Sequence, residues 1–486
     1  MQGVSILIIM AVYFGILYLI SYFVSKKHSD NEAFFLANRK SPWWVVAIAM
    51  VGTSISGVTF VSVPGMVGAQ AMTYMQMVFG FFFGYLTVAY VLLPLYYKLN
   101  LTTIYGYLEQ RLGFCSYKTG ASFFILSKLI GAAARLYLVA LILQTLVFDR
   151  WDVPFTVTVV GIIALIWAYT HKSGIKTIIW TDSLQTLCLV GALFLIIWQV
   201  ASKMSMDFGQ VVDTVKSSEY FRIFEFDWGS KQNFFKQFFS GIFITIVMTG
   251  LDQDMMQKNL TVKNLKDSQK NMLTYGFAFV PINFLFLCLG ILLLVFASSQ
   301  GIVLPEKSDQ ILPVLASEYL GLPVLIFFTV GIIAAAFSSA DSALTALTTT
   351  VCVDLLNVKK EEAGKAKKTR LKVHIGVSIV FAIVILIINA INNTNVLDAI
   401  YTVASYTYGP LLGMFCFGLF TKRAILKDKL VPYVCILAPV LSFSIDVLLK
   451  QLFNYTVGYE ILMFNGLLTF IGLWILSKKS DVKTID

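Results

Sequence analysis

A stripe of oxygen-bearing side chains interrupts an apolar stretch that runs from Gly331 to Leu356. About 20 apolar residues suffice to cross a lipid bilayer, so the stretch is long enough to span one. Four positions spaced i, i+3, i+4 and i+7 would share one face of a helix: Ser338, Asp341, Ser342 and Thr345. Serines also let membrane helices pack closely, but an ionisable group at membrane depth is costly and marks an ion or substrate path. Asp341 therefore favours a cation site over simple close packing.

The composition of the whole chain indicates an all-α polytopic membrane protein. Apolar residues make up 58% of the 486 residues and charged residues 13%, and the mean hydropathy is +0.78. Residues 1–24 have no basic region before the apolar run and are expected to form a retained helix, not a cleaved signal. Hydrophobic runs predict twelve further spans, which gives thirteen transmembrane helices. These runs lie at about 43–70, 75–98, 118–148, 153–170, 177–202, 234–257, 272–298, 322–356, 371–392, 397–421, 431–450 and 455–477.

The distribution of basic residues predicts the orientation of the chain. Alternate segments, at 25–41, 98–118, 171–176, 258–270, 358–372, 422–430 and 478–486, hold 27 Lys and Arg, whereas the other loops and ends hold 7. Because cytoplasmic loops are enriched in these residues, the N-terminus is expected outside the cell membrane and the C-terminus inside. The asymmetry accounts for most of the net charge of +10 and argues against a nucleic-acid partner. The long outer loop 203–233 is expected to lie along the membrane surface.

Two of the predicted spans are interrupted by polar and small residues. In the first, Gly52 to Gly57 breaks an otherwise apolar run, and in the second the sequence Met248 to Asp254 does so. Unwound backbone survives in a membrane only where it is buried or lines a cavity, and its free carbonyls can bind a cation. A simple glycine kink would explain the first break equally well. Paired interrupted spans nevertheless point to a midplane binding site in an inverted-repeat transporter.

Five motifs in the same order resemble the sodium/solute symporter family, which contains sodium-coupled proline, sialic acid, sugar and iodide carriers. They are FFLANRKSPWW (Phe34–Trp44), TTIYGYLEQRLG (Thr102–Gly113), IKTIIWTDSLQ (Ile175–Gln185), LDQDMMQKNL (Leu251–Leu260) and YGPLLGMFCFGLFTKRA (Tyr408–Ala424). The resemblance implies a five-plus-five inverted repeat with one extra N-terminal helix and two extra C-terminal helices. The implied parts are an extra helix at 1–24, repeats at 42–202 and 234–422, the loop 203–233, two helices at 431–478 and a tail at 479–486.

The resemblance also implies a sodium site between the first and eighth core helices. The ligands carried over are the backbone carbonyls of Gly52, Ile55 and Ala335 and the hydroxyls of Ser338 and Ser339. Oxygen ligands suit a hard cation, and neutral oxygens would hold a monovalent ion weakly enough to release it.

Some members of the family bind a second sodium ion. The residues that match its ligands are Asp182, Ser338 and Ser342, while Asp341 stands where relatives carry Ser or Thr. Two carboxylates at one site repel each other unless a cation or a proton lies between them. The sequence therefore allows two sodium ions, or one sodium ion and a proton, and favours the former. In the alternative, Asp182 or Asp341 simply pairs with a buried Lys128.

The family's solute pocket lies at the broken helices and on the second, third and tenth core helices. The corresponding candidates are Ser54, Ser56, Thr59, Gln76, Arg135, Tyr406 and Tyr408. Lys128 is expected to pair with a structural partner such as Asp182 rather than with the solute. Arg135 lies one helical turn beyond Gly131, the position that aligns with the arginine of the sialic acid carriers, so the solute stays unnamed.

The predicted function is sodium-coupled import of a small polar organic solute by alternating access, with one or two sodium ions per cycle. The solute classes considered are sugars, sialic acid or other carboxylates, and amino acids. The alternatives are an iodide-like anion carrier, a sodium channel and a transporter-like sensor. An enzyme is not expected, because the chain has no HExxH motif and His28, His171 and His374 are expected at loops or helix ends. The expected partners are the solute, sodium and the lipid bilayer, and the protein is expected to be a monomer.

Overall fold

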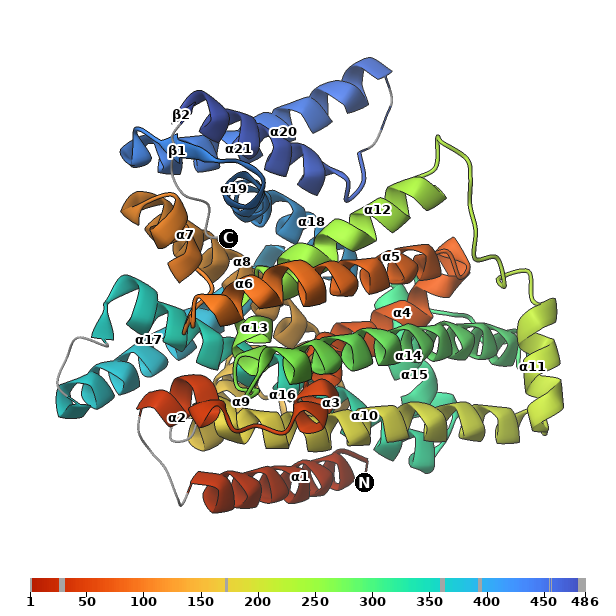
Figure 1. Cartoon of the computed structure of the whole chain (residues 1–486). Helices are drawn as coiled ribbons and strands as arrows, with labels where there is room; N and C mark the ends of the chain where they lie inside the picture. Colours follow the sequence, from red (N-terminus) through yellow and green to blue (C-terminus); the bar gives the residue numbers. More distant parts are fainter. Residues whose placement is uncertain are drawn as a thin grey trace.

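The protein is described here by a computed structural model that covers residues 2–25, 31–170, 174–358, 363–391, 396–453, 455 and 457–479. Almost all of the described chain is helical, and long helices cross one another around a central group (Figure 1). This arrangement agrees with the predicted all-α membrane protein.

The first half of the chain contains ten α-helices. They are α1 (Gln2–Ser25), α2 (Asn31–Leu36), α3 (Trp43–Ser54), α4 (Gly57–Gln70), α5 (Tyr74–Thr87), α6 (Leu93–Lys98), α7 (Gly106–Arg111), α8 (Phe114–Leu143), α9 (Phe155–Thr170) and α10 (Gly174–Lys203). One π-helical turn, Val88–Leu92, joins α5 to α6, and another, Gln144–Phe148, ends α8.

The second half contains eleven α-helices and the two strands of the described chain. The helices are α11 (Phe208–Ser217), α12 (Phe234–Thr245), α13 (Gln253–Asn259), α14 (Leu265–Ser299), α15 (Ile311–Val314), α16 (Leu322–Thr350), α17 (Ala363–Ile391), α18 (Val396–Thr407), α19 (Gly409–Phe420), α20 (Val431–Phe453) and α21 (Ile461–Ile475). Strands β1 (Arg423–Ile425) and β2 (Ser477–Lys479) pair antiparallel. Strand β1 precedes α20 and β2 follows α21, so the pairing brings together the two ends of the segment that contains both helices.

Every predicted span corresponds to a helix or to a pair of helices. Eight helices are long and apolar enough to cross a membrane, and three bent pairs raise the number to eleven. Two shorter apolar helices, Phe155–Ala168 and Ile461–Ile475, occupy the positions of the remaining two predicted spans. The described structure therefore supports a polytopic helical protein with eight to eleven candidate spans.

Three of the spans are broken. The break between α3 and α4 bends the chain by 56°, and the break between the α12 segment and α13 bends it by 67°. Both were predicted, and each has a local cause: Ile55 and Ser56 leave the helical conformation, and Asp252 caps α13 by accepting hydrogen bonds from the amides of Asp254 and Met255.

The third break, of 45° between α18 and α19, was not predicted. It lies where Gly409 and Pro410 follow Tyr408. Pro410 has no amide hydrogen to continue the helical ladder, so the chain restarts there as a new helix. The Gly-Pro pair was therefore the available sequence signal.

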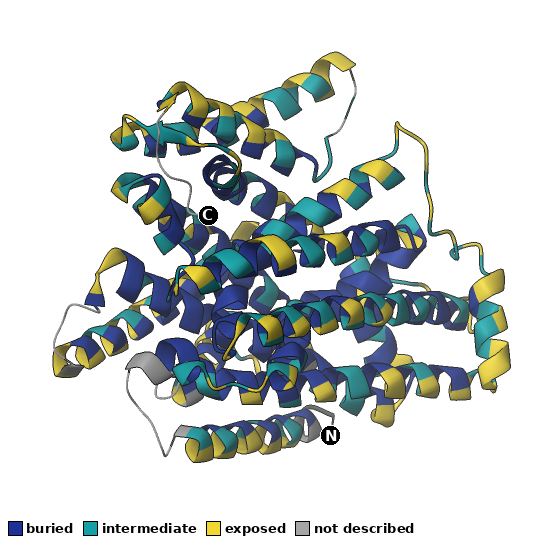
Figure 2. Ribbon diagram, in the orientation of Figure 1, coloured by how far each residue is buried: buried dark blue, intermediate teal, exposed yellow. Residues whose placement is uncertain are grey.

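The central helices are the most buried part of the molecule. In Figure 2 the inner ribbons are mostly dark blue, whereas the outward sides of α1, α17 and α20 are yellow. The most apolar window of α16 is 72% buried, against 22% for that of α17. Because α10 packs along both α3 and α16, it holds the polar face of α16 against the first broken span.

Glycine allows one of the tightest helix crossings, between α5 and α12. A Cβ at Gly80 would lie 2.1 Å from the carbonyl oxygen of Phe238, and one at Gly241 would lie 2.3 Å from that of Met77. Small residues at such crossings let the two backbones approach closely. The crossing therefore fixes α12, and with it the second broken span, against α5.

The segment 203–233 was predicted to be a loop along the membrane surface, and part of it is helical. Helix α11 begins with a capping box formed by Asp207 and Gln210. After it the chain is held at the first turn of α5, where the amide of Glu225 donates to Gln76 Oε1 at 3.0 Å and Gln76 Nε2 donates to the carbonyl of Gln232 at 2.8 Å. This segment carries exposed aromatic side chains, among them Phe208 and Trp228.

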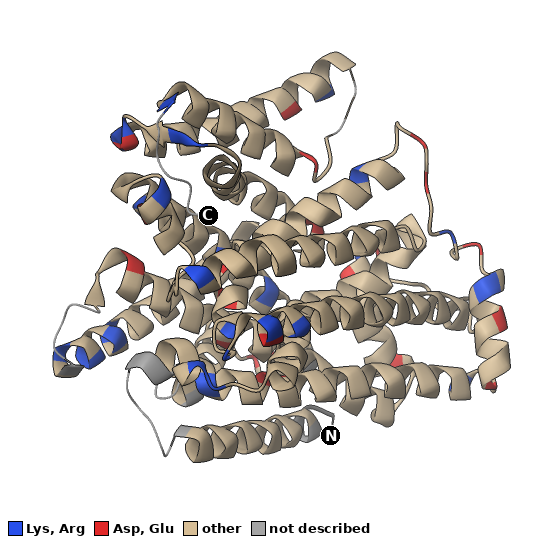
Figure 3. Ribbon diagram, viewed as in Figure 1, with Lys and Arg blue, Asp and Glu red and all other residues tan. Residues whose placement is uncertain are grey.

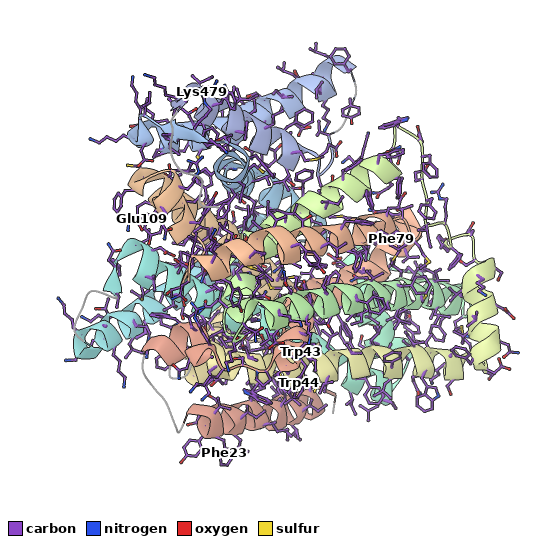
Figure 4. The ribbon with its side chains drawn as sticks, in the orientation of Figure 1. Phe23, Trp43, Trp44, Phe79, Glu109 and Lys479 are labelled. Atoms are coloured by element: carbon purple, nitrogen blue, oxygen red, sulfur yellow. The ribbon has the colours of Figure 1, made fainter. Side chains whose placement is uncertain are left out.

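Aromatic residues lie near several helix ends. Figure 4 labels Trp43 and Trp44 at the start of α3, Phe23 near the end of α1 and Phe79 on α5. Trp44 and Phe23 are exposed, and Phe79 stacks on Phe224 with ring centroids 6.4 Å apart. Exposed aromatic side chains at helix ends are typical of membrane–water interfaces.

The expectation for His374 was wrong. Helix α17 begins at Ala363, eight residues before the predicted span, so His374 lies inside the helix and is buried. Its Nδ1 lies 2.9 Å from Thr348 Oγ1 and its Nε2 lies 3.1 Å from Thr170 Oγ1. His28 and His171 fall outside the described residues.

Candidate functional site

The first broken span meets the polar face of α16 at Ser339. The hydroxyl of Ser339 lies 3.2 Å from the carbonyl oxygen of Thr53, in the last turn of α3, and 3.2 Å from that of Ala335 in its own helix. Because the chain bends after Ser54, the last carbonyls of α3 lack the amides that a continuous helix would supply. The structure thus brings the last turn of α3 against α16 at the turn that carries Ala335 and Ser339, two of the residues predicted for the first sodium site.

Two further observations describe this place. The hydroxyl of Ser338 is completely buried and makes no hydrogen bond to another described residue. At Gly52, a Cβ would lie 2.1 Å from Thr186 Oγ1 and 3.3 Å from the carbonyl oxygen of Asp182, so α3 and α10 touch there. A buried hydroxyl without a partner is costly, and this one precedes Ser339, which contacts the end of α3.

Asp182, predicted to bind a second cation, is completely buried and holds the ammonium group of Lys258. The distance from Lys258 Nζ to Asp182 Oδ2 is 2.6 Å. Thr53 Oγ1 donates to the same carboxylate oxygen at 3.0 Å and also contacts Lys258 Nζ. Lys258 was expected in a cytoplasmic loop, and Lys128 was expected to pair with a structural partner such as Asp182. Both assignments were wrong, because α13 continues the second broken span and carries Lys258 back into the core.

Lys128 instead pairs with the two aspartates at the second break. Its Nζ lies 2.6 Å from Asp254 Oδ2 and 3.2 Å from Asp252 Oδ2. Tyr408 donates to Asp252 Oδ2 at 2.7 Å, and Ser342 donates to Asp254 Oδ1. The hydroxyl of Ser342 is therefore engaged by α13 and not by Asp182. Figure 3 shows how few charged positions lie among the central helices, which are mostly tan.

A polar cavity adjoins this charged group and lies between the two breaks. Three of the predicted solute residues line it: Ser54, Arg135 and Tyr408. Gly131, one turn before Arg135, lines it as well. The ion pairs found among the described residues use Lys128, Arg222 and Lys258 as their cations. Arg135 is therefore a cavity cation that no described carboxylate neutralises by direct contact.

Four of the predicted solute residues do not line this cavity. Gln76 holds the segment after α11, as described above, and Ser56 and Thr59 are buried in the packing around α4. Tyr406 lines a second cavity, where its hydroxyl lies 3.3 Å from Asp446 Oδ2. The physical reason is the helical phase: Tyr406 and Tyr408 are two residues apart at the end of α18, so they point to different sides and line different cavities.

Several cavity residues were not predicted. Tyr275 lies 2.5 Å from Ser54 Oγ and 2.8 Å from the hydroxyl of Tyr85, and Tyr401 and Asp252 also line the cavity. The motif LDQDMMQKNL is one of the five that resemble the symporter family. Its three charged residues, Asp252, Asp254 and Lys258, are the sequence signal for this part of the site. The tyrosines carry no such signal, since aromatic residues are common throughout the chain.

A hydrogen bond between two tyrosines separates the two cavities. Tyr401 lines both of them, whereas Tyr74 lines only the second. Their hydroxyl oxygens are 3.0 Å apart. The second cavity also includes Lys231 and Gln232 from the segment after α11, so it opens toward that end of the molecule.

The family model described as "Sodium:solute symporter family" matches residues 34–428, which is most of the chain. The chain belongs to the sodium:solute symporter family. It is accordingly a sodium-coupled solute symporter and a multi-pass membrane protein, not an enzyme. The resemblance seen in the five motifs is thereby confirmed.

Two relatives match over nearly the full length of the chain. The sodium/sialic acid symporter NanT of Aliivibrio fischeri is 25% identical over 94% of this chain and 91% of its own length. The sodium/sialic acid symporter SiaT of Proteus mirabilis is 24% identical over 94% of this chain and 93% of its own.

The fold matches that of a solved symporter. A substrate-bound, outward-open structure of a Na⁺-coupled sialic acid symporter superposes with a TM-score of 0.82 at 20% identity, covering 98% of this chain and 99% of that one. Mhp1, a transporter of the nucleobase-cation-symport-1 family, gives 0.56 at 15% identity over 92% and 94% of the two chains. These likenesses show that the overall fold is shared.

Proposed function

We propose that sodium binds where the first break meets α16 and that its binding is coupled to a carboxylate-bearing solute in the adjacent cavity. The sodium ligands in this proposal are the carbonyl oxygens of Gly52, Ile55 and Ala335 and the hydroxyls of Ser338 and Ser339. The observation that carries it is the 3.2 Å contact between the Ser339 hydroxyl and the carbonyl of Thr53, since it joins the last turn of α3 to α16 at one of the hydroxyls that would bind the ion.

We propose that a second positive charge lies beside the first sodium ion. Its site is formed by the predicted second set of residues, Asp182, Ser338, Asp341 and Ser342. Asp182 holds a cationic group at 2.6 Å, and Asp341 lies on the same face of α16. Whether that positive charge is a sodium ion or belongs to the protein determines the number of ions moved per cycle.

Arg135 supports an anionic solute. It lines the cavity, and none of the ion pairs of the described residues includes it. A planar guanidinium binds a carboxylate through two parallel hydrogen bonds. The cavity also presents hydroxyl groups from Ser54, Tyr85 and Tyr275, which suit a hydroxylated body. Sialic acid has both a carboxylate and hydroxyl groups, and the two full-length relatives are named for it. It is therefore the first solute to test.

The transport cycle follows from the position of the cavity between two broken spans. Sodium would order the α3–α4 break and so complete the wall of the cavity at Ser54, after which the two repeats rock about the loaded site. Tyr74 and Tyr401 would separate the site from the second cavity while it is loaded. Inward movement of one sodium ion gains about 2.3 kcal/mol per 100 mV of membrane potential.

The proposed architecture keeps thirteen spans in a five-plus-five inverted repeat, with repeats at 42–202 and 234–422. The extra helix at 1–24 and the helices at 431–478 lie outside the repeats, and the segment 203–233 joins the two repeats. The N-terminus is proposed to lie outside the cell membrane and the tail at 479–486 inside, in a monomer. Of that tail, residues 480–486 fall outside the described residues.

The experiment is uptake of radiolabelled sialic acid into proteoliposomes that contain the purified protein. Concentrative uptake is expected with an inward sodium gradient and not with a potassium gradient. A parallel panel of a neutral sugar, an amino acid, a monocarboxylate and iodide tests the solute class. Uptake of the sugar but of no carboxylate would refute the role of Arg135, and sodium-independent uptake would refute the proposed coupling.

A further inference from the structure

The ammonium group of Lys258 binds Asp182, the residue of the predicted second cation site that lies on α10. Its side chain is 0% exposed, and its Nζ lies 2.6 Å from Asp182 Oδ2 and in contact with the hydroxyl of Thr53. These two oxygens belong to α10 and to the last turn of α3. Lys258 itself belongs to α13, so one positive charge joins both broken spans to α10.

We infer that Lys258 takes the place of the second sodium ion, so that this symporter binds one sodium ion and carries its second site charge as a tethered ammonium. The inference rests on the proposed function, because it assumes that the first sodium ion binds beside Ser338 and Ser339. It assigns to Lys258 a role in setting the number of ions that the transporter moves.

The geometry leaves no equivalent position for a metal ion on Asp182 Oδ2. That oxygen already accepts from the ammonium group at 2.6 Å and from Thr53 Oγ1 at 3.0 Å. A second hydroxyl expected in the site, that of Ser342, is bonded to Asp254. A sodium ion would have to displace the ammonium group or lie beside it, and two positive charges at such a separation repel each other strongly in a buried site.

The backbone that carries Lys258 is fixed at both ends of α13. Asp252 caps the start of α13, and the carbonyl of Lys258 accepts a hydrogen bond from Thr261 Oγ1 at the end of the helix. The neighbouring Lys128 is engaged separately by Asp252 and Asp254 and so does not compete for Asp182. The ammonium group of Lys258 is therefore the cation that Asp182 binds among the described residues.

An ordinary structural ion pair would show the same contacts, and ion counting separates the two cases. If Lys258 occupies a cation site, its removal leaves a buried carboxylate whose Oδ1 has no partner among the described residues and whose Oδ2 lies 3.0 Å from Thr53 Oγ1. A sodium ion would then bind there. A purely structural pair would leave the number of bound sodium ions unchanged when it is broken.

The experiment is equilibrium binding of radioactive sodium to the full chain in lipid nanodiscs, without solute. One ion per chain is expected for the wild type and for Lys258→Arg, which keeps the tethered charge. Two ions are expected for Lys258→Met. One is expected again for the double variant Lys258→Met with Asp182→Asn, which has neither the lysine nor the carboxylate.

Two bound ions in the wild type, or one in Lys258→Met, would overturn the inference. Retention of the first ion shows that Lys258→Met is folded. If that variant does not fold, the wild type and Asp182→Asn decide: a single ion that persists in Asp182→Asn supports the inference, and loss of an ion in Asp182→Asn overturns it. No binding in any of these proteins would instead refute the proposed sodium site, and the inference with it.

Discussion

Single residues explain how the charges among the central helices are accommodated. Lys128 is shared by Asp252 and Asp254, and Lys258 is bound to Asp182. A buried ionic group is tolerated only when a partner and hydrogen bonds compensate for its lost hydration. Arg135 differs from the two lysines, because it faces the cavity with no carboxylate in direct contact, and this difference distinguishes a solute-binding cation from structural ones.

Replacing Arg135 tests its proposed contact with the solute. Arg135→Gln is expected to weaken the apparent affinity for a carboxylate solute by about 30-fold or more, because the loss of one partner of a buried charge pair costs roughly 2 kcal/mol or more. Sodium binding without solute should not change. Arg135→Lys keeps the charge and loses the two-point contact. Its apparent affinity for the solute should lie between those of the wild type and Arg135→Gln. Wild-type affinity in Arg135→Gln uptake assays would exclude this contact.

Replacing Lys128 tests the assignment of this residue to the structure. Lys128→Met leaves Asp252 and Asp254 without their cation, so the protein should lose about 3–5 kcal/mol of stability. Its melting temperature in detergent is expected to fall below that of the wild type. Adding Asp254→Asn should recover much of the loss, since it removes one of the two uncompensated carboxylates. If the double variant is less stable than Lys128→Met, this pairing does not stabilise the fold.

Whole elements show which parts of the site can be read from sequence. The breaks after Ser54 and near Leu251 were predicted because Gly, Ser and Asp interrupt apolar runs there, and such residues are visible without any tertiary contact. The burial of Lys258 was not predicted, since a lysine that follows a helix break has the same local sequence whether the next turn enters the cytoplasm or returns to the core. Only the packing of α13 against α16 decides between them.

The same limit applies to the solute residues. Ser54, Arg135 and Tyr408 line the cavity as expected, but Gln76 and Tyr406 do not. A tertiary contact of Gln76 with the segment after α11 takes up its amide. Tyr406 lies two residues before Tyr408 on the same helical turn, so the two side chains point to different sides. Helical phase thus identifies candidate faces, but it does not show which face borders the cavity.

The crossing of α5 and α12 provides a prediction at this scale. Gly241→Ala should destabilise the protein by about 1–3 kcal/mol, because its Cβ would meet the backbone of Met77 and overpacked contacts cost that much. Gly191→Ala on α10 is the matched control, since nothing lies within 4 Å of its Cβ. Alanine favours a helix over glycine, so the control should not lower the melting temperature. Equal melting temperatures would contradict the close crossing.

At the scale of the molecule, the distribution of basic residues predicts the orientation in the membrane. Of the Lys and Arg residues, 27 fall in one set of segments and 7 in the other. Lys258 is counted in the larger set although it is buried. Leaving it out of the count leaves the asymmetry almost unchanged. The second cavity and α11 would then face outward, so that solute enters past Tyr74 and Tyr401.

Labelling from the two sides of the membrane checks this orientation. In a cysteine-free version of the protein, Gln210→Cys on α11 should react with a membrane-impermeant maleimide added to intact cells. Lys427→Cys, between β1 and α20, should react only after the cells are opened. Both positions are exposed, so the side of the membrane decides their reactivity. The opposite pattern would reverse the proposed topology.

The most direct test of sodium binding at the first break is the melting temperature of the purified protein in sodium or potassium chloride at equal ionic strength. A bound ion stabilises the native state by an amount that grows with its concentration, about 2.7 kcal/mol at 100 times the dissociation constant. The wild type should therefore melt at a higher temperature in sodium, and this difference should disappear in the double variant Ser338→Ala with Ser339→Ala. The same sodium-dependent rise in the double variant as in the wild type would contradict the proposed site.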